Sequence, residues 1–269
     1  MDIFSIIILG LTQGITEWVP ISSKTQDTLV YVKFLGGDPA MVIPVLLYLH
    51  IGTVLAATIY FRKEIAGILN AIVKKPTAIG EHARSKPGFL FTALLFTGVV
   101  GVPLLLVEKI FFPSMEWGLL LVLMGAGLVL TGFFLSSHKG IKIRTVEEVG
   151  WKDGVLTGIL QGLSVLPGVS RSGTSTTGLI WREFDSESSF YLSFLLSIPT
   201  VIMAELVFYV GGAVKIFPVS DGILLALSSF FFGYITLDSL LRIVKRVNLA
   251  YFAAALGLIM IAAGLLGAG

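Results

Sequence analysis

The sequence contains no cysteine, which excludes disulfide bonds, thiolate metal sites and a cysteine nucleophile. It is also poor in charge: Asp, Glu, Lys and Arg make up 13% of the 269 residues, whereas soluble domains carry roughly 25%. The net charge of +2 does not indicate a nucleic-acid partner. Hydrophobic residues are correspondingly frequent and make up 55% of the chain.

The charge deficit is concentrated in long runs. Six segments contain no Asp, Glu, Lys or Arg, apart from Glu205 in the fourth: residues 42–61, 89–107, 118–137, 190–214, 222–237 and 249–269. Each is near the length of about 20 residues with which an α-helix crosses a bilayer. We therefore predict an all-α polytopic membrane protein with at least six spans. The N-terminal stretch lacks a basic region and a cleavage site, so we expect no signal peptide.

Two further apolar segments, residues 2–34 and 152–182, are interrupted by Pro, Gly, Ser and charge. The first is broken at "VPISSK" and the second at "LPGVSRSG". Their halves are shorter than the roughly 17 residues of the shortest spans, so each segment predicts a re-entrant helix–loop–helix hairpin. Irregular backbone at membrane depth persists only where protein or a water-filled cavity covers it. We expect the two breaks to face each other or a shared cavity.

An internal repeat relates the two hairpins. "ILGLTQGITEWVPISS" (residues 8–23) aligns with "LTGILQGLSVLPGVSR" (residues 156–171). The alignment matches Gly10 with Gly158, Gln13 with Gln161, Gly14 with Gly162 and Ser22 with Ser170. It divides a single membrane domain, residues 1–269, into a first repeat (1–137), a cytoplasmic linker (138–152) and a second repeat (153–269). One hairpin and three spans in each half would invert the second half relative to the first.

The loop charges alternate along the chain. Lys and Arg are frequent in residues 62–86, 139–152 and 242–246, and sparse in the connections between them. By the positive-inside rule, the basic loops are cytoplasmic. This predicts that both termini lie outside, that the first hairpin opens to the outside and that the second enters from the cytoplasm.

The motifs "QGITEWVPISS" and "LPGVSRSGTS" resemble the two signatures of the undecaprenyl-diphosphate phosphatase family, also called bacitracin-resistance proteins. The first signature is Glu/Gln-x-x-x-Glu followed by Pro-x-Ser-Ser, and the second is Pro-Gly-x-Ser-Arg-Ser-Gly. The resemblance covers essentially the whole chain. It implies a metal-assisted hydrolase of the plasma membrane that converts a polyprenyl diphosphate to the monophosphate and inorganic phosphate. Such lipid-carrier recycling serves cell-wall or glycan biosynthesis. Whether the protein forms a homodimer stays open.

Cleavage of a phosphoanhydride requires neutralised phosphate charge, a nucleophile and a proton acceptor. Arg171 offers a planar fork of donors that suits phosphate oxygens. Glu17 could hold Mg²⁺ (or Ca²⁺), which prefers oxygen ligands, or act as the base. Gln13 lies one helical turn earlier on the same face and is the second predicted metal ligand. The family pattern points to Ser23 as the nucleophile, with a water molecule as the alternative.

The remaining predicted site residues surround the two breaks, where backbone N–H groups and hydroxyl groups can bind phosphate. They are Ser22, Lys24, Thr25, Gln26, Ser170, Ser172, Gly173 and Thr174.

The chain departs from the family pattern after the first motif. The family has Gly and His where this sequence has Thr25 and Gln26, and a glutamine cannot act as a general acid or base at neutral pH. We therefore predict a divergent member. Asp27, His50 and Glu205 are the accessory candidates: His50 could replace the missing histidine or be structural, and Glu205 could pair with Arg171 or with a hydroxyl group.

Other functions fit the same pattern. Glu17 and Arg171 could form a structural ion pair between the repeats. Broken helices in inverted repeats are also a transporter architecture, so a polyprenyl-phosphate transporter or flippase is the alternative function. A lipid-phosphate binder without turnover is a third. We predict the phosphatase, because the residues that its chemistry needs are all present.

Overall fold

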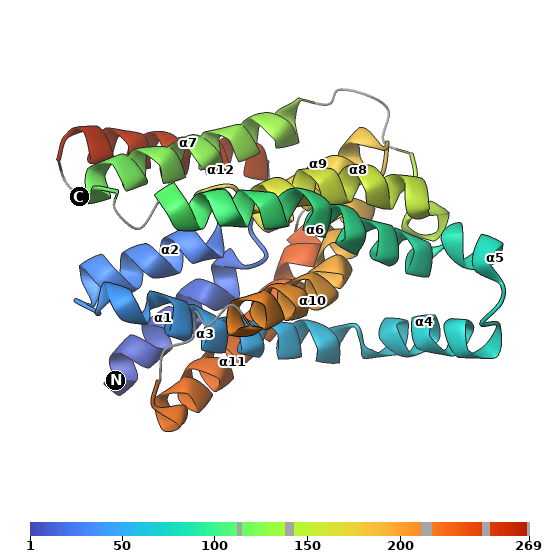
Figure 1. Cartoon of the computed structure of the whole chain (residues 1–269), viewed down its shortest axis with the longest axis horizontal. Helices are drawn as coiled ribbons and strands as arrows, with labels where there is room; N and C mark the ends of the chain where they lie inside the picture. Colours follow the sequence, from blue (N-terminus) through green and yellow to red (C-terminus); the bar gives the residue numbers. More distant parts are fainter. Residues whose placement is uncertain (112–114, 138–142, 211–216, 244–247, 268–269) are drawn as a thin grey trace.

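The computed structural model describes residues 1–111, 115–137, 143–210, 217–243 and 248–267. Within these ranges every regular element is a helix, and the β-type pairing is a single isolated bridge between Arg144 and Phe184. The helices pack into one elongated bundle, from which α4 and α5 project at one end (Figure 1). The predicted all-α architecture is confirmed.

Twelve α-helices are present in the described ranges. They are α1 (Ile3–Thr16), α2 (Ser23–Leu29), α3 (Val42–Tyr60), α4 (Arg62–Lys74), α5 (Ile79–Ala83), α6 (Lys86–Phe111), α7 (Trp117–Ser136), α8 (Trp151–Gly162), α9 (Arg171–Trp181), α10 (Ser186–Val210), α11 (Val219–Ile243) and α12 (Leu249–Leu265). A π-helical turn, η1 (Val30–Phe34), extends α2, and the 3₁₀ turns are η2 (Pro39–Met41), η3 (Val146–Glu148) and η4 (Leu163–Val165).

Five of these helices are long and apolar enough to cross a membrane: Pro39–Tyr60, Lys86–Val107, Trp117–Ser136, Ser186–Val207 and Val219–Ile243. The sixth predicted span corresponds to α12, an apolar helix of 17 residues. Large apolar side chains such as Phe91, Phe133 and Leu258 are exposed on the outside of the bundle, which suits contact with lipid. The chain is a multi-pass membrane protein.

Both interrupted segments form a helix, a break and a second helix, as predicted. In the first, Ser22 takes the left-handed conformation (φ 61°) between the end of α1 and the start of α2. In the second, Gly168 has φ 80°, and a Cβ there would lie 1.9 Å from the Met124 carbonyl oxygen of α7. Gly168 thus lets the second break lie directly against α7. Re-entry of the two hairpins from opposite membrane surfaces stays a prediction.

Matching glycines of the two repeats make equivalent helix contacts. Gly14 lets α1 approach α11 at Gly233, and the matched Gly162 lets α8 approach α6 at Val100. α7 and α12 lie side by side (Figure 1), and Gly125 and Gly257 each face the carbonyl oxygen of the other. Reciprocal contacts of this kind agree with two related halves. The inverted orientation of these halves stays a prediction.

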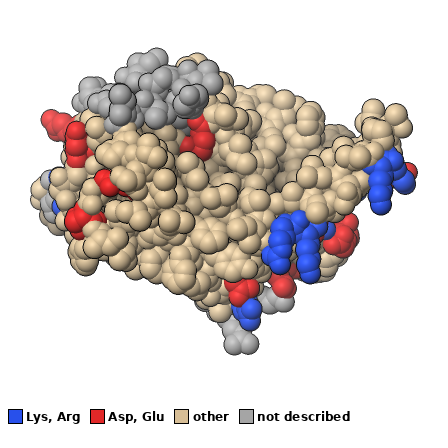
Figure 2. Space-filling view, turned by 90° about the horizontal axis from the view of Figure 1, so that it is seen from below, with Lys and Arg blue, Asp and Glu red and all other residues tan. Residues whose placement is uncertain are grey.

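The basic segment 62–86 is largely helical, since it contains α4 and α5. Figure 2 shows Lys and Arg gathered at the end of the molecule that carries these helices, while acidic side chains prevail toward the opposite end. Part of the predicted linker (138–142) and most of the third basic cluster (244–246) lie outside the described residues. The described part therefore has one predominantly basic end.

Candidate active site

The two helix breaks meet inside the bundle. Ser172, in the first turn of α9, donates a hydrogen bond to the Val19 carbonyl oxygen of the first break (3.2 Å). A Cβ on Gly173 would lie 3.1 Å from the Pro20 side chain. Thr131 of α7 supports the second break, because its Oγ1 accepts a hydrogen bond from the Ser170 N–H (3.1 Å). The prediction that the breaks face each other is confirmed.

An ion pair joins the two breaks at this meeting point. Arg171, the first residue of α9, donates from Nη2 to Oε1 of Glu17, the C-cap of α1. The Glu17 side chain is 5% exposed and that of Arg171 is 15% exposed. The second guanidinium nitrogen of Arg171, Nη1, is buried without a hydrogen-bond partner. Arg171 therefore keeps an unused donor beside the carboxylate.

The other carboxylate oxygen of Glu17 accepts two hydrogen bonds. Ser23 Oγ donates to Oε2 at 2.7 Å, and Gln13 Nε2 donates to the same atom at 3.1 Å. Gln13 Nε2 also lies 3.3 Å from Thr53 Oγ1, which ties this group to α3. The three predicted catalytic residues, Glu17, Ser23 and Arg171, are thus in direct contact.

Buried aromatic packing fixes the backbone that carries Glu17. The neighbouring Trp18 is 1% exposed, and its Nε1–H donates to the Gly233 carbonyl oxygen of α11 (2.9 Å). The Trp18 ring also packs against Phe194 of α10, with ring centroids 5.3 Å apart. The helix end at Glu17 is therefore anchored to two other helices.

The predicted phosphate-binding residues lie in the first turns of α2 and α9. Ser170 caps α9 by accepting from the Gly173 N–H (3.3 Å), and Thr174 Oγ1 donates back to the Ser170 carbonyl oxygen (3.0 Å). In α2, the hydroxyl groups of Ser22 and Thr25 are hydrogen-bonded to each other (3.0 Å). Lys24 lies between them in the sequence and is partly exposed. The other amides of the first turn of α9, those of Arg171 and Ser172, lack acceptors within the helix, which suits an anion.

Gln26 and Asp27 differ sharply in their surroundings. The Gln26 amide donates to the Ile21 carbonyl oxygen (3.1 Å) and so holds the loop. Asp27 is completely buried, and neither of its carboxylate oxygens has a hydrogen-bond partner.

His50 contacts the site from α3. Its Nε2 lies 3.7 Å from Glu17 Oε2, and its Nδ1 lies 3.4 Å from Glu205 Oε1 on α10. The partner of Glu205 is therefore His50, whereas Arg171 pairs with Glu17. Of the three accessory candidates, His50 contacts Glu17 directly and Glu205 contacts it through His50, whereas the Asp27 carboxylate has no hydrogen-bond partner.

The bacitracin resistance protein family BacA matches residues 6–263. The chain belongs to this family. Three curated relatives are each called undecaprenyl-diphosphatase. The one from Methanothrix thermoacetophila is 35% identical, and the match covers 97% of each chain. The relative from Methanococcoides burtonii is 34% identical over 95% of this chain and 96% of its own. That from Haloarcula marismortui is 35% identical over 97% and 96%. The resemblance of the two motifs to this family is confirmed.

Unpartnered oxygens on α1 and α2 fit the divalent cation that the resemblance of the two motifs implies. The Gln13 Oε1 and both Asp27 carboxylate oxygens are buried and lack partners. Mg²⁺ prefers oxygen ligands and takes one or two carboxylates together with water and substrate phosphate. Among the described residues, no three His, Asp or Glu side chains are grouped as a metal site. A cation would therefore be held partly by the substrate.

Two threonines in apolar helices were missed by the sequence analysis. Thr53 holds the Gln13 amide, and Thr131 holds the backbone of the second break. Both are essentially buried. A hydroxyl group within a predicted span is a weak signal, because threonine also bonds within its own helix, as Thr131 does to the Gly127 carbonyl oxygen (2.9 Å).

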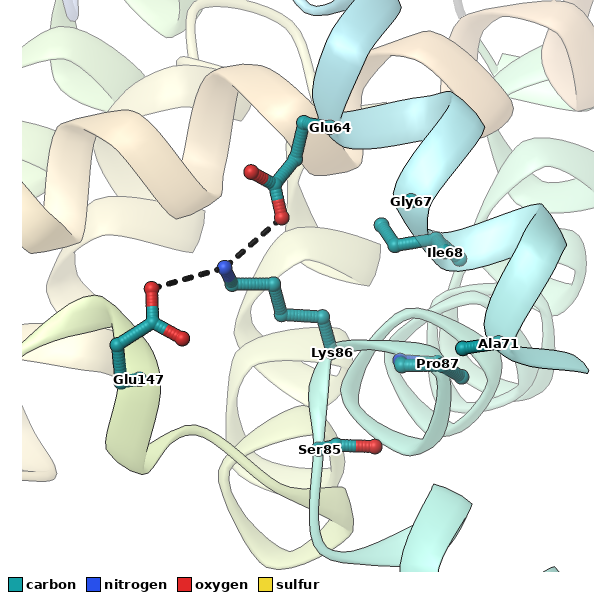
Figure 3. Close-up of a pocket in the computed structure, with 8 residues that line it drawn as sticks. All are labelled: Glu64, Gly67, Ile68, Ala71, Ser85, Lys86, Pro87 and Glu147. Carbon is teal, nitrogen blue, oxygen red and sulfur yellow. Dashed lines mark hydrogen bonds and ion pairs between the residues drawn. The ribbon is translucent and has the colours of Figure 1, made fainter.

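A separate pocket of about 210 Å³ lies between α4, α6 and η3, away from this site. Figure 3 shows Lys86 between the carboxylates of Glu64 and Glu147, with Nζ–O distances of 2.8 and 3.1 Å. Tyr191 of α10 also donates to Glu64 (3.2 Å). None of the predicted site residues lines this pocket. Its ion pairs attach α4 and η3 to the bundle.

Proposed function

We propose that the protein is an integral membrane phosphatase that hydrolyses an undecaprenyl-type polyprenyl diphosphate to the monophosphate and inorganic phosphate. The single observation that carries this proposal is the position of Glu17, which lies between Arg171 of the second break and Ser23 of the first. Membership of the bacitracin resistance family and the name of the relatives support the same reaction.

The site residues divide the chemistry among them. Arg171 Nη1 and the first amides of α9 bind the terminal phosphate and stabilise the charge that develops on its oxygens. Ser23 Oγ–H already points at Glu17, so Glu17 is placed to accept that proton as a P–O bond forms. The P–O bond to the lipid monophosphate breaks in the same displacement, which leaves the phosphoryl group on Ser23. Water then attacks this phosphoserine, the P–O bond to Ser23 breaks, Ser23 regains its proton, and inorganic phosphate is released. With water as the nucleophile, Glu17 would accept the proton of the water instead.

Mg²⁺ (or Ca²⁺) is the proposed cofactor. When bound, it neutralises phosphate charge and helps to orient the diphosphate. Glu17 and Gln13 would hold it, and the unpartnered Asp27 carboxylate of α2 would be a further oxygen ligand. This assignment gives a role to buried oxygens that have no partner within the protein.

The transporter alternative gains no support from the three relatives, whose shared name is that of a hydrolase. A purely structural Glu17–Arg171 pair would not require Ser23 to donate to the same carboxylate or leave a guanidinium nitrogen unpaired. The phosphatase accounts for both features.

The basic end of the molecule supports one orientation in the plasma membrane. We place α4 and α5 at the cytoplasmic surface, because Lys and Arg gather there (Figure 2). Both termini then lie outside, the first hairpin opens to the outside, and the second enters from the cytoplasm. The lipid substrate is the proposed partner.

Phosphate release by the purified protein tests the function. A C15 and a C55 polyprenyl diphosphate are each supplied with Mg²⁺ or with EDTA. We expect Mg²⁺-dependent release that Arg171→Ala and Glu17→Gln each lower by about 10²-fold or more. Arg62→Ala and Glu81→Gln are matched controls at exposed positions and keep the activity. No release from either lipid by a protein that still binds polyprenyl phosphate through Arg171 would favour transport.

A further inference from the structure

His50 bridges two carboxylates that come from different helices. Its Nε2 faces Glu17 at the end of α1 (3.7 Å), and its Nδ1 faces Glu205 on α10 (3.4 Å). The ring is therefore held from α10 while it contacts the carboxylate of the active site. Two carboxylates in largely apolar surroundings are costly unless a donor or a positive charge lies between them.

No other described histidine can take this position. His82 lies in α5, where its Nε2 is 2.7 Å from the Lys75 carbonyl oxygen. Gln26 stands where the family pattern has its histidine, but its amide is bonded to Ile21. Within the described ranges, His50 of α3 is the only histidine that contacts Glu17.

We expect the contacts of Glu17 to change when substrate binds. In this structure Arg171 Nη2 is bonded to Oε1, yet a phosphate group carries more negative charge and competes for the same guanidinium. As Arg171 turns to the phosphate, the contacts on Oε2 remain: Ser23, Gln13 and His50. Of these three side chains, only the imidazole is also held by a second carboxylate, that of Glu205 on α10.

We propose that His50, braced by Glu205, is a positioning residue for Glu17. It keeps the carboxylate directed at the Ser23 hydroxyl while Arg171 binds the phosphate. The proposal rests on the proposed role of Glu17 as proton acceptor. In this proposal Glu205 acts indirectly: it holds His50, and His50 contacts Glu17.

Steady-state kinetics of a double-mutant cycle test the proposal with a C15 polyprenyl diphosphate. We expect His50→Phe to lower kcat about 10–100-fold, as for residues that orient a catalytic carboxylate. KM stays nearly unchanged, because Arg171 and α9 bind the phosphate. Glu205→Gln also lowers kcat, but adds no further loss in the His50→Phe background. His50→Gln restores part of kcat, because its amide can donate to Glu17.

The controls separate positioning from folding. His82→Phe, which changes the partly exposed histidine of α5, keeps both constants. Thermal unfolding is recorded for every variant. Should His50→Phe not fold, the cycle with Glu205→Gln is completed in the His50→Gln background. The proposal would be overturned if the kcat losses of His50→Phe and Glu205→Gln multiplied in the double variant. It would also be overturned if a folded His50→Phe variant kept its kcat or changed only in KM. Absence of release by the unmodified protein would instead reject the phosphatase itself.

Discussion

At the scale of single residues, the adjacent serines 22 and 23 make a matched pair. Ser23 Oγ donates to Glu17, whereas the Ser22 hydroxyl is bonded to Thr25. We expect Ser23→Ala to lower kcat for phosphate release by about 10²-fold or more, because the residue that loses its proton to Glu17 is gone. Ser22→Ala should lower kcat less than Ser23→Ala, because the Ser22 hydroxyl is bonded to Thr25 and not to Glu17. Equal losses in the two variants, measured by phosphate release, would contradict the assignment of Ser23.

The pairing of Glu17 with Arg171 could be inferred from the sequence, although 154 residues separate them. Both are ionised groups at a helix break, and breaks at membrane depth need a shared polar environment. The contact of His50 with Glu205 could not be inferred in the same way. Each lies in a helix that is apolar on all sides, so no periodicity indicates which face meets which neighbour.

At the scale of elements, helices pack closely at glycines, and a Cβ added at such a glycine changes the stability of the fold. A Cβ on Gly52 of α3 would lie 2.1 Å from the Ala226 carbonyl oxygen of α11, whereas one on Gly98 of α6 would meet nothing within 4 Å. We expect Gly52→Ala to destabilise the fold by about 1–3 kcal/mol through overpacking. Gly98→Ala should be neutral or stabilise by up to about 1 kcal/mol. Unfolding in detergent measures both, and a similar loss in both variants would refute the packing argument.

The broken helices were the elements most readily predicted, since Pro20, Pro167 and the glycines and serines around them interrupt two apolar runs. The conformation of the breaks was not predictable. Ser22 takes a left-handed conformation that glycine usually adopts, and this turn directs Ser23 to Glu17 and Gln26 to Ile21. The phosphate-binding role expected for Gln26 therefore competes with its role in the loop.

A buried carboxylate anchors the start of α8. Asp153 bonds to Arg144 and Arg182, each at 2.8 Å. Burial raises the pKa of Asp153, but the hydrogen bonds from the two arginines outweigh it and hold the pKa below its ordinary value of 3.8. We expect Asp153→Asn to destabilise the protein by about 2 kcal/mol at pH 7. This is less than for a fully buried pair, because the Arg182 side chain is 39% exposed.

The pH dependence of this effect has a definite sign. A carboxyl group with a lowered pKa contributes its stability above the pKa of the unfolded chain and loses it as the pH falls through the folded value. The difference between the unmodified protein and Asp153→Asn should therefore be constant above about pH 5 and shrink below 3.8. Denaturant unfolding at several pH values measures it. A difference that grows on acidification would contradict the ion-pair explanation.

At the scale of the whole molecule, the absence of cysteine offers a direct test of orientation. Ala40 precedes α3 and Thr77 lies between α4 and α5; both residues are exposed. Because Lys and Arg gather at the end with α4 and α5, we expect Thr77→Cys to face the cytoplasm and Ala40→Cys to face outside. In intact cells, a membrane-impermeant maleimide should label Ala40→Cys alone, and after lysis it should label both. The unmodified chain has no thiol, so any label reports on the introduced cysteine. Labelling of Thr77→Cys alone in intact cells would show that the proposed topology is inverted.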